Sequence, residues 1–258
     1  MTWTIRQRSS IGPLAAITAG EGPVVLLIHG VGLRAEAWGA QIDALSQTCR
    51  LIAVDMPGHG ASAALPARPS LVGFVDAIAG VLDQPAVVVG HSFGAMIGLD
   101  MAIRHPTRVK GVAALNAIYR RDAAAQAAVM ARAGSLDGAT TADPTATLER
   151  WFGAHVTPQR MACDGWLRMA DPAGYRAAYR VFASHNGPAT ADLSALHCPA
   201  LFMTGADEPN STPAMSREMA DLAPNGRAEI IADAAHMAPM THPARVNTVL
   251  SDFIRGCT

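Results

Sequence analysis

A serine between two glycines follows a run of valines near the middle of the chain. Gly90-His91-Ser92-Phe93-Gly94 comes directly after Val87 to Val89, and a pattern of apolar residues with helical spacing comes next. A G-x-S-x-G turn between a strand and a helix is so tight that its flanking residues tolerate little more than a hydrogen, and it exposes the serine above the end of the sheet. Ser92 is therefore the candidate nucleophile.

A serine hydroxyl is a weak nucleophile by itself. The hypothesis therefore requires a base, an acid that orients the base, and hydrogen-bond donors for an oxyanion. His236 is the candidate base, because it follows the last predicted strand in the chain order nucleophile, acid, histidine.

The first central strand ends in His29-Gly30-Val31-Gly32, where small residues leave backbone N–H groups free to face a substrate. We expect the amides of Val31 and Phe93 to form the oxyanion hole, the latter at the start of a helix whose dipole favours negative charge. A plain glycine turn is the alternative interpretation. In the first interpretation His29 and Gly30 also lie beside the substrate.

Short apolar runs alternate with segments of helical period along most of the chain. Continuous apolar runs suit strands that are buried on both faces, so we predict an α/β fold with a mainly parallel sheet and crossover helices. An antiparallel hairpin of residues Thr2 to Ser9 and Leu14 to Ala19 is expected before the sheet. The predicted strands are Val24 to Ile28, Leu51 to Val54, Val87 to Val89, Val112 to Leu115, Leu201 to Met203 and Glu229 to Ile231. The predicted helices are Ala35 to Ser46, Leu71 to Leu82, Phe93 to Arg104, Pro213 to Leu222 and Ala244 to Ile254.

The alternation stops between Tyr119 and Cys198, where the residues indicate three or four short helices. Because strand signals resume afterwards, residues 119–198 are predicted to be a helical cap inserted into a core formed by residues 1–118 and 199–258. Within this cap, Tyr175 and Tyr179 belong to an apolar stripe that is expected to line a substrate pocket, although simple packing explains each ring as well.

Composition excludes several classes of function. A formal charge of −1 gives no basis for binding nucleic acid. The amino-terminal residues lack the apolar core of a signal peptide and no apolar run suits a membrane helix, so no membrane partner and a cytoplasmic location are expected. The four cysteines are scattered, which indicates neither a metal site nor a disulfide framework. A homo-oligomer is left open.

The motifs together resemble the α/β-hydrolase fold superfamily. They are His29-Gly30-Val31-Gly32, Asp55-Met56-Pro57-Gly58-His59-Gly60-Ala61-Ser62, Gly90-His91-Ser92-Phe93-Gly94, Gly205-Ala206-Asp207-Glu208 and His236-Met237-Ala238-Pro239. The likeness is greatest to small capped esterases and lactonases of the 3-oxoadipate enol-lactonase type. In that family the stretch from Asp55 to Ser62 is a structural loop, so the resemblance gives Asp55 and His59 no catalytic role.

The same resemblance bears on the catalytic acid and on the nucleophile. In the family the acid stands three residues after the glycine that ends its strand, which favours Glu208 over Asp207, although either carboxylate can orient a histidine. Relatives that act on haloalkanes or epoxides have an aspartate nucleophile, and Ser92 argues against both activities.

The expected activity is hydrolysis of a small carboxylic ester or lactone through an acyl-enzyme on Ser92, without a metal or an organic cofactor. The alternatives are a C–C bond hydrolase or a cofactor-free perhydrolase with the same triad, and a non-catalytic ligand-binding relative. Arg176 and Arg180 lie one helical turn apart and form a candidate anchor for a substrate carboxylate. The alternative is that both arginines are solvated on the outer face of their helix.

Overall fold

A computed structural model describes residues 3–66 and 69–258. One sheet has the strand order β1-β2-β4-β3-β5-β6-β7-β8. β2 is antiparallel to β1 and β4, and the other neighbouring strands are parallel, as an α/β fold requires. The strands are β1 (Ser9–Ile11), β2 (Leu14–Ala19), β3 (Val24–Ile28), β4 (Arg50–Val54), β5 (Ala86–His91), β6 (Val109–Leu115), β7 (Ala200–Gly205) and β8 (Gly226–Ile231).

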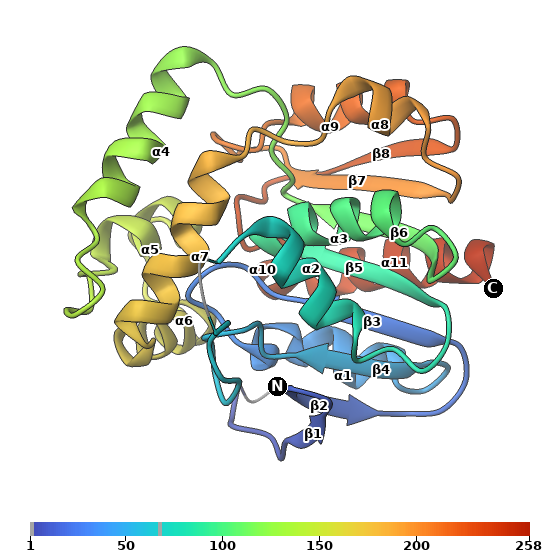
Figure 1. The fold of residues 1–258 in the computed structure, drawn as a ribbon, viewed down its shortest axis with the longest axis horizontal. Helices are drawn as coiled ribbons and strands as arrows, with labels where there is room; N and C mark the ends of the chain where they lie inside the picture. The colour runs from blue at the N-terminus through green and yellow to red at the C-terminus, as the bar shows by residue number, and fades with distance from the viewer. Residues whose placement is uncertain (1–2, 67–68) are drawn as a thin grey trace.

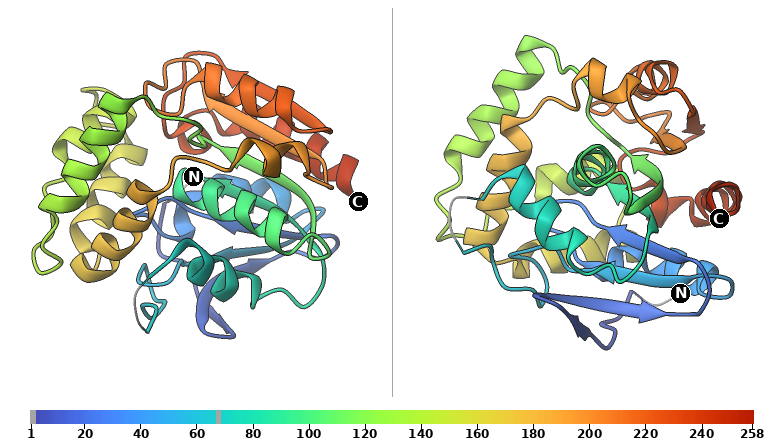
Figure 2. Two further views of the ribbon diagram at one scale, coloured as in Figure 1. Left: turned by 45° about the horizontal axis from the view of Figure 1, so that its top comes forward. Right: turned by 45° about the vertical axis from the view of Figure 1, so that its right-hand side comes forward.

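Helices cover both faces of this sheet (Figures 1 and 2). Alternate residues of one strand serve the two faces: Leu26 and Ile28 of β3 belong to one apolar core, and Val25 and Leu27 to the other. The continuous apolar runs follow from this double burial. The first core contains α2 (Leu71–Ala79), α3 (Phe93–Arg104), α8 (Thr190–Ser194) and α9 (Pro213–Leu222), and the second contains η1 (Ala35–Trp38), α1 (Gly39–Leu45), α10 (Ala238–Thr241) and α11 (Pro243–Cys257).

Four further helices stand together at one side of the sheet, in green to yellow at the left of Figure 1. They are α4 (Ala123–Ser135), α5 (Thr145–Phe152), α6 (Pro158–Met169) and α7 (Pro172–Ser184), and all four lie between β6 and β7 in the chain. The fifth helix of this insertion, α8, packs against α9 of the core instead. We use "cap helices" for α4 to α7 only.

The amino-terminal hairpin differs from the prediction. β1 begins only at Ser9, and Gly12-Pro13 forms the turn to β2; Thr2 of the predicted strand lies outside the described residues. The preceding residues bind the core through side chains instead of a sheet ladder. Arg8 donates from Nε to Asp55 Oδ2 at 2.9 Å and from Nη2 to Glu36 Oε2 at 2.6 Å. These buried carboxylates therefore determine the path of the amino-terminal segment.

The described ranges also give two negative findings. No helix within residues 3–66 and 69–258 combines the length and the apolar character that crossing a membrane requires. In the same ranges, no cluster of three or more His, Cys, Asp or Glu side chains has an arrangement that could hold a metal ion.

Candidate active site

Ser92 stands between the end of β5 and the start of α3 with φ 57° and ψ −116°, a conformation that is strained for any residue with a side chain. The two flanking glycines make this turn possible. A Cβ on Gly90 would lie 2.1 Å from the carbonyl oxygen of Gly94, and one on Gly94 would lie 2.2 Å from the carbonyl oxygen of Ile28. The strand, the turn and the helix thus pack too closely for any side chain at either position, and the serine is held at the carboxyl edge of the sheet.

His236 follows β8, and its imidazole donates from Nδ1 to Glu208 Oε2 at 2.8 Å. Glu208 follows β7 and is buried, whereas Asp207 is exposed. The other carboxylate oxygen of Glu208 accepts hydrogen bonds from the backbone amides of Asn210 and Ser211, at 2.8 and 3.3 Å. The structure therefore brings Glu208 to the histidine and leaves Asp207 on the surface.

The surroundings of Glu208 favour its ionised form. Burial alone would raise the pKa of this carboxyl, but the charge and hydrogen bond of His236 and the two backbone amides outweigh burial and lower the pKa to about 2. Glu208 is consequently a carboxylate at neutral pH, and it fixes the Nδ1–H tautomer of His236. Nε2 of the same ring is then free to accept a proton.

Two aromatic rings contact the imidazole of His236, one from the cap helices and one from the core. Trp151 of the cap helix α5 stacks on the imidazole, and His91 lies against it at a ring-centroid distance of 4.8 Å. Nε2–H of His91 donates to the main-chain oxygen of His236 at 2.8 Å. Burial first, and then the neighbouring His236, lower the pKa of His91 to about 3, so this residue is a neutral donor that holds the loop in place.

The amide of Phe93 directly follows the serine in the chain, and Val31, on the loop after β3, lines the same cavity as Ser92. Within the described part of the chain, neither amide donates to a protein acceptor. Phe93 begins α3, where the helix dipole adds positive potential. Gly30 allows the β3 loop to approach, because a Cβ there would lie only 3.1 Å from Cβ of Ser92.

His29, expected beside the substrate, does not reach it. Its ring is fully buried, donates from Nδ1 to the Gly30 carbonyl at 2.8 Å, and accepts at Nε2 from the amide of Met56 at 2.9 Å. Both ring nitrogens are therefore occupied by the backbone, and burial lowers the pKa of His29 to about 3, which keeps it neutral. The prediction that His29 binds substrate is wrong; the residue joins the β3 and β4 loops instead.

One cavity of about 440 Å³ joins the core to the cap helices. The core contributes Gly30, Val31, Ser92 and His236 to its wall, and the cap helices contribute Trp151, Tyr175 and Tyr179. Ser92 and His236 thus face the same space, although no hydrogen bond joins their side chains in the structure; such bonds are often long in free enzymes. This arrangement is suited to attack on a carbonyl group by a serine.

The comparison with known proteins agrees with this geometry. Residues 25–249 match the model of the "Alpha/beta hydrolase family". The chain belongs to this family. The hydrolase is 38% identical over 243 residues to an (E)-2-((N-methylformamido)methylene)succinate hydrolase of Acinetobacter baylyi, covering 91% of each chain. The names of the family and of this relative support hydrolase activity.

Solved structures resemble the hydrolase over almost its whole length. A malate-bound thermophilic esterase of Thermogutta terrifontis superposes with a TM-score of 0.86 at 26% identity, covering 98% of this chain and 99% of the other. An enol-lactonase of Burkholderia xenovorans gives a TM-score of 0.83 at 22% identity, covering 96% and 100%. At that identity the lactonase shows a shared fold only.

The arginines that line the cavity differ from the predicted pair. Arg176 and Arg180 line a groove on the outer side of α7 beside Pro69, away from Ser92. They donate to the carbonyls of Asp137 and Ala133, respectively. Of the two interpretations given above, the structure therefore favours the one in which both arginines lie on the outer face of the helix, because the aromatic stripe occupies the inward face of α7.

Three other arginines of the hydrolase line the cavity: Arg121, Arg132 and Arg150. Sequence reasoning missed them. Arg121 precedes α4, and Arg132 and Arg150 lie on the cap helices α4 and α5. The sequence pattern of these helices does not show which of their side chains face the sheet. The one sequence signal is Arg132, the single charged residue in the alanine-rich stretch from Ala123 to Ala133.

Proposed function

We propose that this protein is a serine hydrolase that cleaves a small carboxylic ester or lactone through an acyl-enzyme on Ser92. The observation that carries the proposal is the 2.8 Å hydrogen bond between His236 and buried Glu208. His236 lines the same cavity as Ser92, whose backbone angles are strained. A histidine with a purely structural role would not need to line the same cavity as the serine of the G-x-S-x-G turn. The serine, the histidine and the acid follow the chain order of the family fold.

In the proposed reaction Nε2 of His236 takes the hydroxyl proton of Ser92 as Oγ bonds to the substrate carbonyl carbon. The amides of Val31 and Phe93 donate to the resulting oxyanion, and the carbonyl re-forms as the leaving alcohol takes the proton from His236. A water molecule then attacks the acyl-enzyme, its proton passes to His236, and Ser92 regains a proton as the acid leaves. Glu208 stays ionised and stabilises the imidazolium in both steps.

A second candidate is hydrolysis of an amide, with an amine in place of the alcohol. The 38% identical relative favours it, because that protein is named as a hydrolase of a methylenesuccinate that carries an N-methylformamido group. The same residues would act in the same order, because esters and amides share the carbonyl and the tetrahedral intermediate. The geometry at Ser92 is equally compatible with both leaving groups.

A fluorophosphonate probe tests the nucleophile, since it reacts with activated serines. We expect labelling of Ser92 in the native protein and none in Ser92→Ala, with similar circular dichroism spectra for both. Ser92→Ala and His236→Ala should each lower kcat roughly 10⁴–10⁶-fold, because members of a triad act as a unit. Labelling at another serine, or retention of more than a few per cent of activity by Ser92→Ala, would refute the proposal.

A substrate screen then identifies the bond. Purified protein is assayed on small esters, lactones, N-acyl enamines and dienone-type diketones, and with hydrogen peroxide as an alternative acceptor. Ester or lactone turnover supports the first candidate, and turnover of the enamine amides alone supports the second. Turnover of only the diketones, or peroxide as the preferred acceptor, would replace both candidates with C–C bond hydrolysis or perhydrolysis.

A further inference from the structure

The cavity above Ser92 is lined by cations without counter-charges. None of the ion pairs formed by the described residues involves Arg121, Arg132 or Arg150. Asp122 also lines the cavity, but its Oδ1 accepts a hydrogen bond from the amide of Ala125 at 2.7 Å and caps α4. The wall therefore carries an excess of positive charge that the protein does not neutralise.

Arg121 is the most constrained of these cations. Its side chain is only 8% exposed, and Nη1 donates to the carbonyl of His185 at 2.8 Å and to Gln126 Oε1 at 3.3 Å. The guanidinium lies over the ring of Phe182, 4.6 Å from the centroid. Nη2 is buried and has no hydrogen-bond partner in the described part of the chain. These uncharged contacts thus hold the guanidinium in place and leave one of its donor nitrogens without a hydrogen-bond acceptor among the described residues.

A buried guanidinium without an anion is unfavourable, because its desolvation is not compensated by an opposite charge. The effect is visible in Arg121, whose burial lowers the pKa of the guanidinium to about 10. A protein gains little stability from such a residue. Its placement in the wall of the cavity that contains Ser92 indicates a role toward a ligand.

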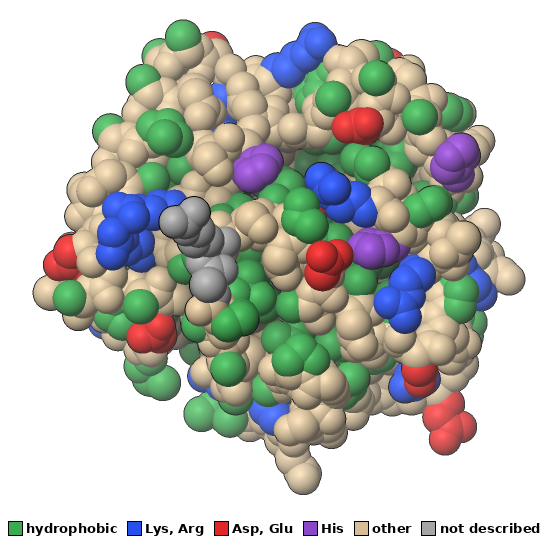
Figure 3. All heavy atoms as spheres, viewed as in Figure 1, with side chains coloured by type: hydrophobic (Ala, Val, Ile, Leu, Met, Phe, Trp, Pro, Cys, Tyr) green, Lys and Arg blue, Asp and Glu red, His purple; other side chains and the backbone are tan. Residues whose placement is uncertain are grey.

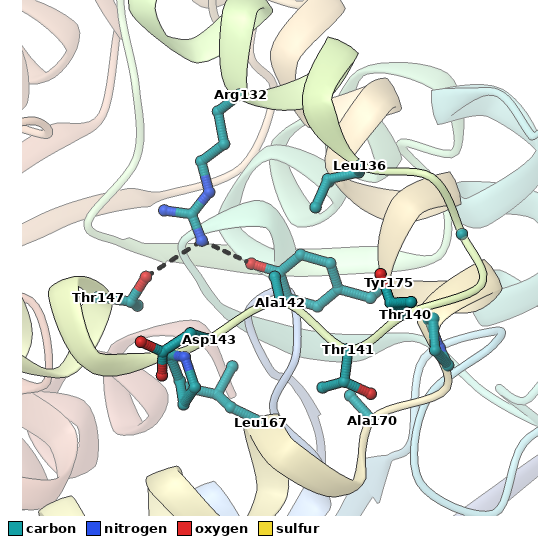
Figure 4. Close-up of a pocket in the computed structure, with 13 residues that line it drawn as sticks. Arg132, Leu136, Thr140, Thr141, Ala142, Asp143, Thr147, Leu167, Ala170 and Tyr175 are labelled. Carbon is teal, nitrogen blue, oxygen red and sulfur yellow. Dashed lines mark hydrogen bonds between the residues drawn. The ribbon is translucent and has the colours of Figure 1, made fainter.

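Arg132 extends the positive wall along the same aromatic stripe. Its guanidinium lies 5.0 Å from the centroid of Tyr179, and Nη2 donates to the hydroxyls of Tyr175 at 3.0 Å and Thr147 at 3.1 Å. Figure 4 shows this arginine pointing from α4 between Thr147 and Tyr175, at the border to a small side pocket of about 20 Å³. These partners are uncharged, so the full positive charge remains available to the cavity.

The positive charge belongs to the cavity and not to the molecule as a whole. The formal net charge of the chain is −1, and on the face in Figure 3 acidic and basic side chains both occur without either sign covering it. A general attraction for polyanions does not explain three arginines around one cavity. A small anion that enters the cavity does.

We propose that the substrates of this enzyme carry a free carboxylate, which the guanidinium of Arg121 binds while Arg132 and Arg150 add positive potential. The inference rests on the proposed function, since it names the substrate class of the same site. Guanidinium and carboxylate form short, charge-assisted hydrogen bonds, and the aromatic stripe beside the arginines excludes water from them. The carboxylate belongs either to the acyl part or to the leaving group of the substrate.

Matched ester pairs test the proposal on both sides of the scissile bond. Methyl hydrogen succinate is compared with methyl pentanoate, and acetoxyacetate with propyl acetate, so that each acidic ester has a neutral ester of similar size. We expect kcat/KM to favour at least one acidic ester by tenfold or more. Arg121→Met should lower kcat/KM for that ester by about 30-fold or more, and change its neutral counterpart less than threefold. Equal losses on both esters, or a preference for the neutral ones, would overturn the proposal.

Two variants keep the test independent of folding. Arg121→Lys retains the charge but loses the planar fork, and it should recover only part of the activity on the acidic ester. Arg180→Met removes a cap arginine on the outer side of α7 and should leave both esters of a pair unchanged. A loss in Arg180→Met equal to that in Arg121→Met would attribute the effect to the cap as a whole and refute the assignment of Arg121.

A binding measurement separates this inference from the proposed chemistry. Calorimetric titration of Ser92→Ala with succinate and with the neutral analogue butane-1,4-diol requires no turnover. Binding of succinate that Arg121→Met weakens tenfold or more supports the carboxylate site even if no ester is cleaved. Hydrolysis of esters without any binding of succinate would leave the proposed function intact and overturn the inference.

Discussion

The indole of Trp151 lies nearly parallel to the imidazole of His236, with ring centroids 5.3 Å apart and an angle of 19° between the planes. Trp151 comes from α5 of the cap, and His236 comes from the loop after β8. In the proposed reaction the imidazole becomes positively charged, and the face of an indole attracts a cation. The cap therefore contacts the proposed base directly, in addition to forming part of the cavity wall.

Replacing Trp151 should lower the rate of the chemical step. A cation–π contact of about 1–2 kcal/mol predicts that Trp151→Leu reduces kcat by roughly 5–30-fold, and that Trp151→Phe, which keeps an aromatic face, loses less. Steady-state kinetics on the best ester of the screen measures both parameters. A purely structural role would change thermal stability or KM equally in both variants and leave kcat of Trp151→Leu no lower than that of Trp151→Phe.

The two neighbouring carboxylates after β7 are expected to behave very differently. Glu208→Gln keeps the shape of the side chain but removes the charge that supports the imidazolium, so kcat should fall by about 10³–10⁴-fold. Asp207→Asn changes an exposed side chain and should retain nearly full activity. The two variants differ by one residue position and one methylene, which makes each the control of the other. Greater damage from Asp207→Asn would show that the loop adopts another register in solution.

Glu208 also predicts a component of acid stability. The pKa of this carboxyl in the folded protein is about 2, below the ordinary value of 4.5. The group therefore contributes stability that is fully present above pH 4.5 and is lost as the pH falls toward 2. Urea unfolding between pH 3 and 6 should show a steeper loss of stability in the native protein than in Glu208→Gln, which lacks the titrating group. Parallel curves would contradict the assigned environment of Glu208.

Gly205 holds the acid and base loops together. A Cβ at this last residue of β7 would lie 2.0 Å from the carbonyl oxygen of Ala234, two residues before His236. Gly205→Ala must therefore push the two loops apart, and we expect lower thermal stability together with a loss of kcat. Gly165→Ala is the control, because a Cβ there meets nothing within 4 Å in the middle of α6. It should raise stability by about 0.5–1 kcal/mol without changing kcat.

The sheet and the nucleophile turn could be predicted because local sequence determines them. Strands buried on both faces have continuous apolar runs. The tight turn at Ser92 requires glycine at position 90 because of the turn itself, and at position 94 because the end of the neighbouring strand β3 lies against it. The resemblance to the family supplied the spacing from Gly205 that favours Glu208, the carboxylate that faces His236. These features depend on contacts within or between adjacent parallel strands, whose carboxyl ends meet at one edge.

The cap was less predictable, because helical periodicity identifies an apolar face without saying what that face packs against. Tyr175 and Tyr179 of the apolar stripe line the cavity, whereas Arg176 and Arg180 beside them on α7 line a groove on its outer side. The arginines that line the cavity come from α4, from α5 and from the segment just before α4, and packing between helices sets the position of these elements over the sheet. The role of His29 was unpredictable for a related reason, because its hydrogen bond with Met56 forms only when β3 and β4 are adjacent.

The division of the cavity wall between core and insertion has an evolutionary consequence. Every group proposed to make or break bonds lies outside α4 to α7, whereas all three cavity arginines lie between β6 and β7. Exchange of this one contiguous segment would redirect such an enzyme to neutral substrates without disturbing its nucleophile. The exchange has one constraint, since Trp151 is the ring that covers His236. A transplanted segment that lacks an aromatic side chain at this point would inherit the substrate preference of its donor but a slower reaction.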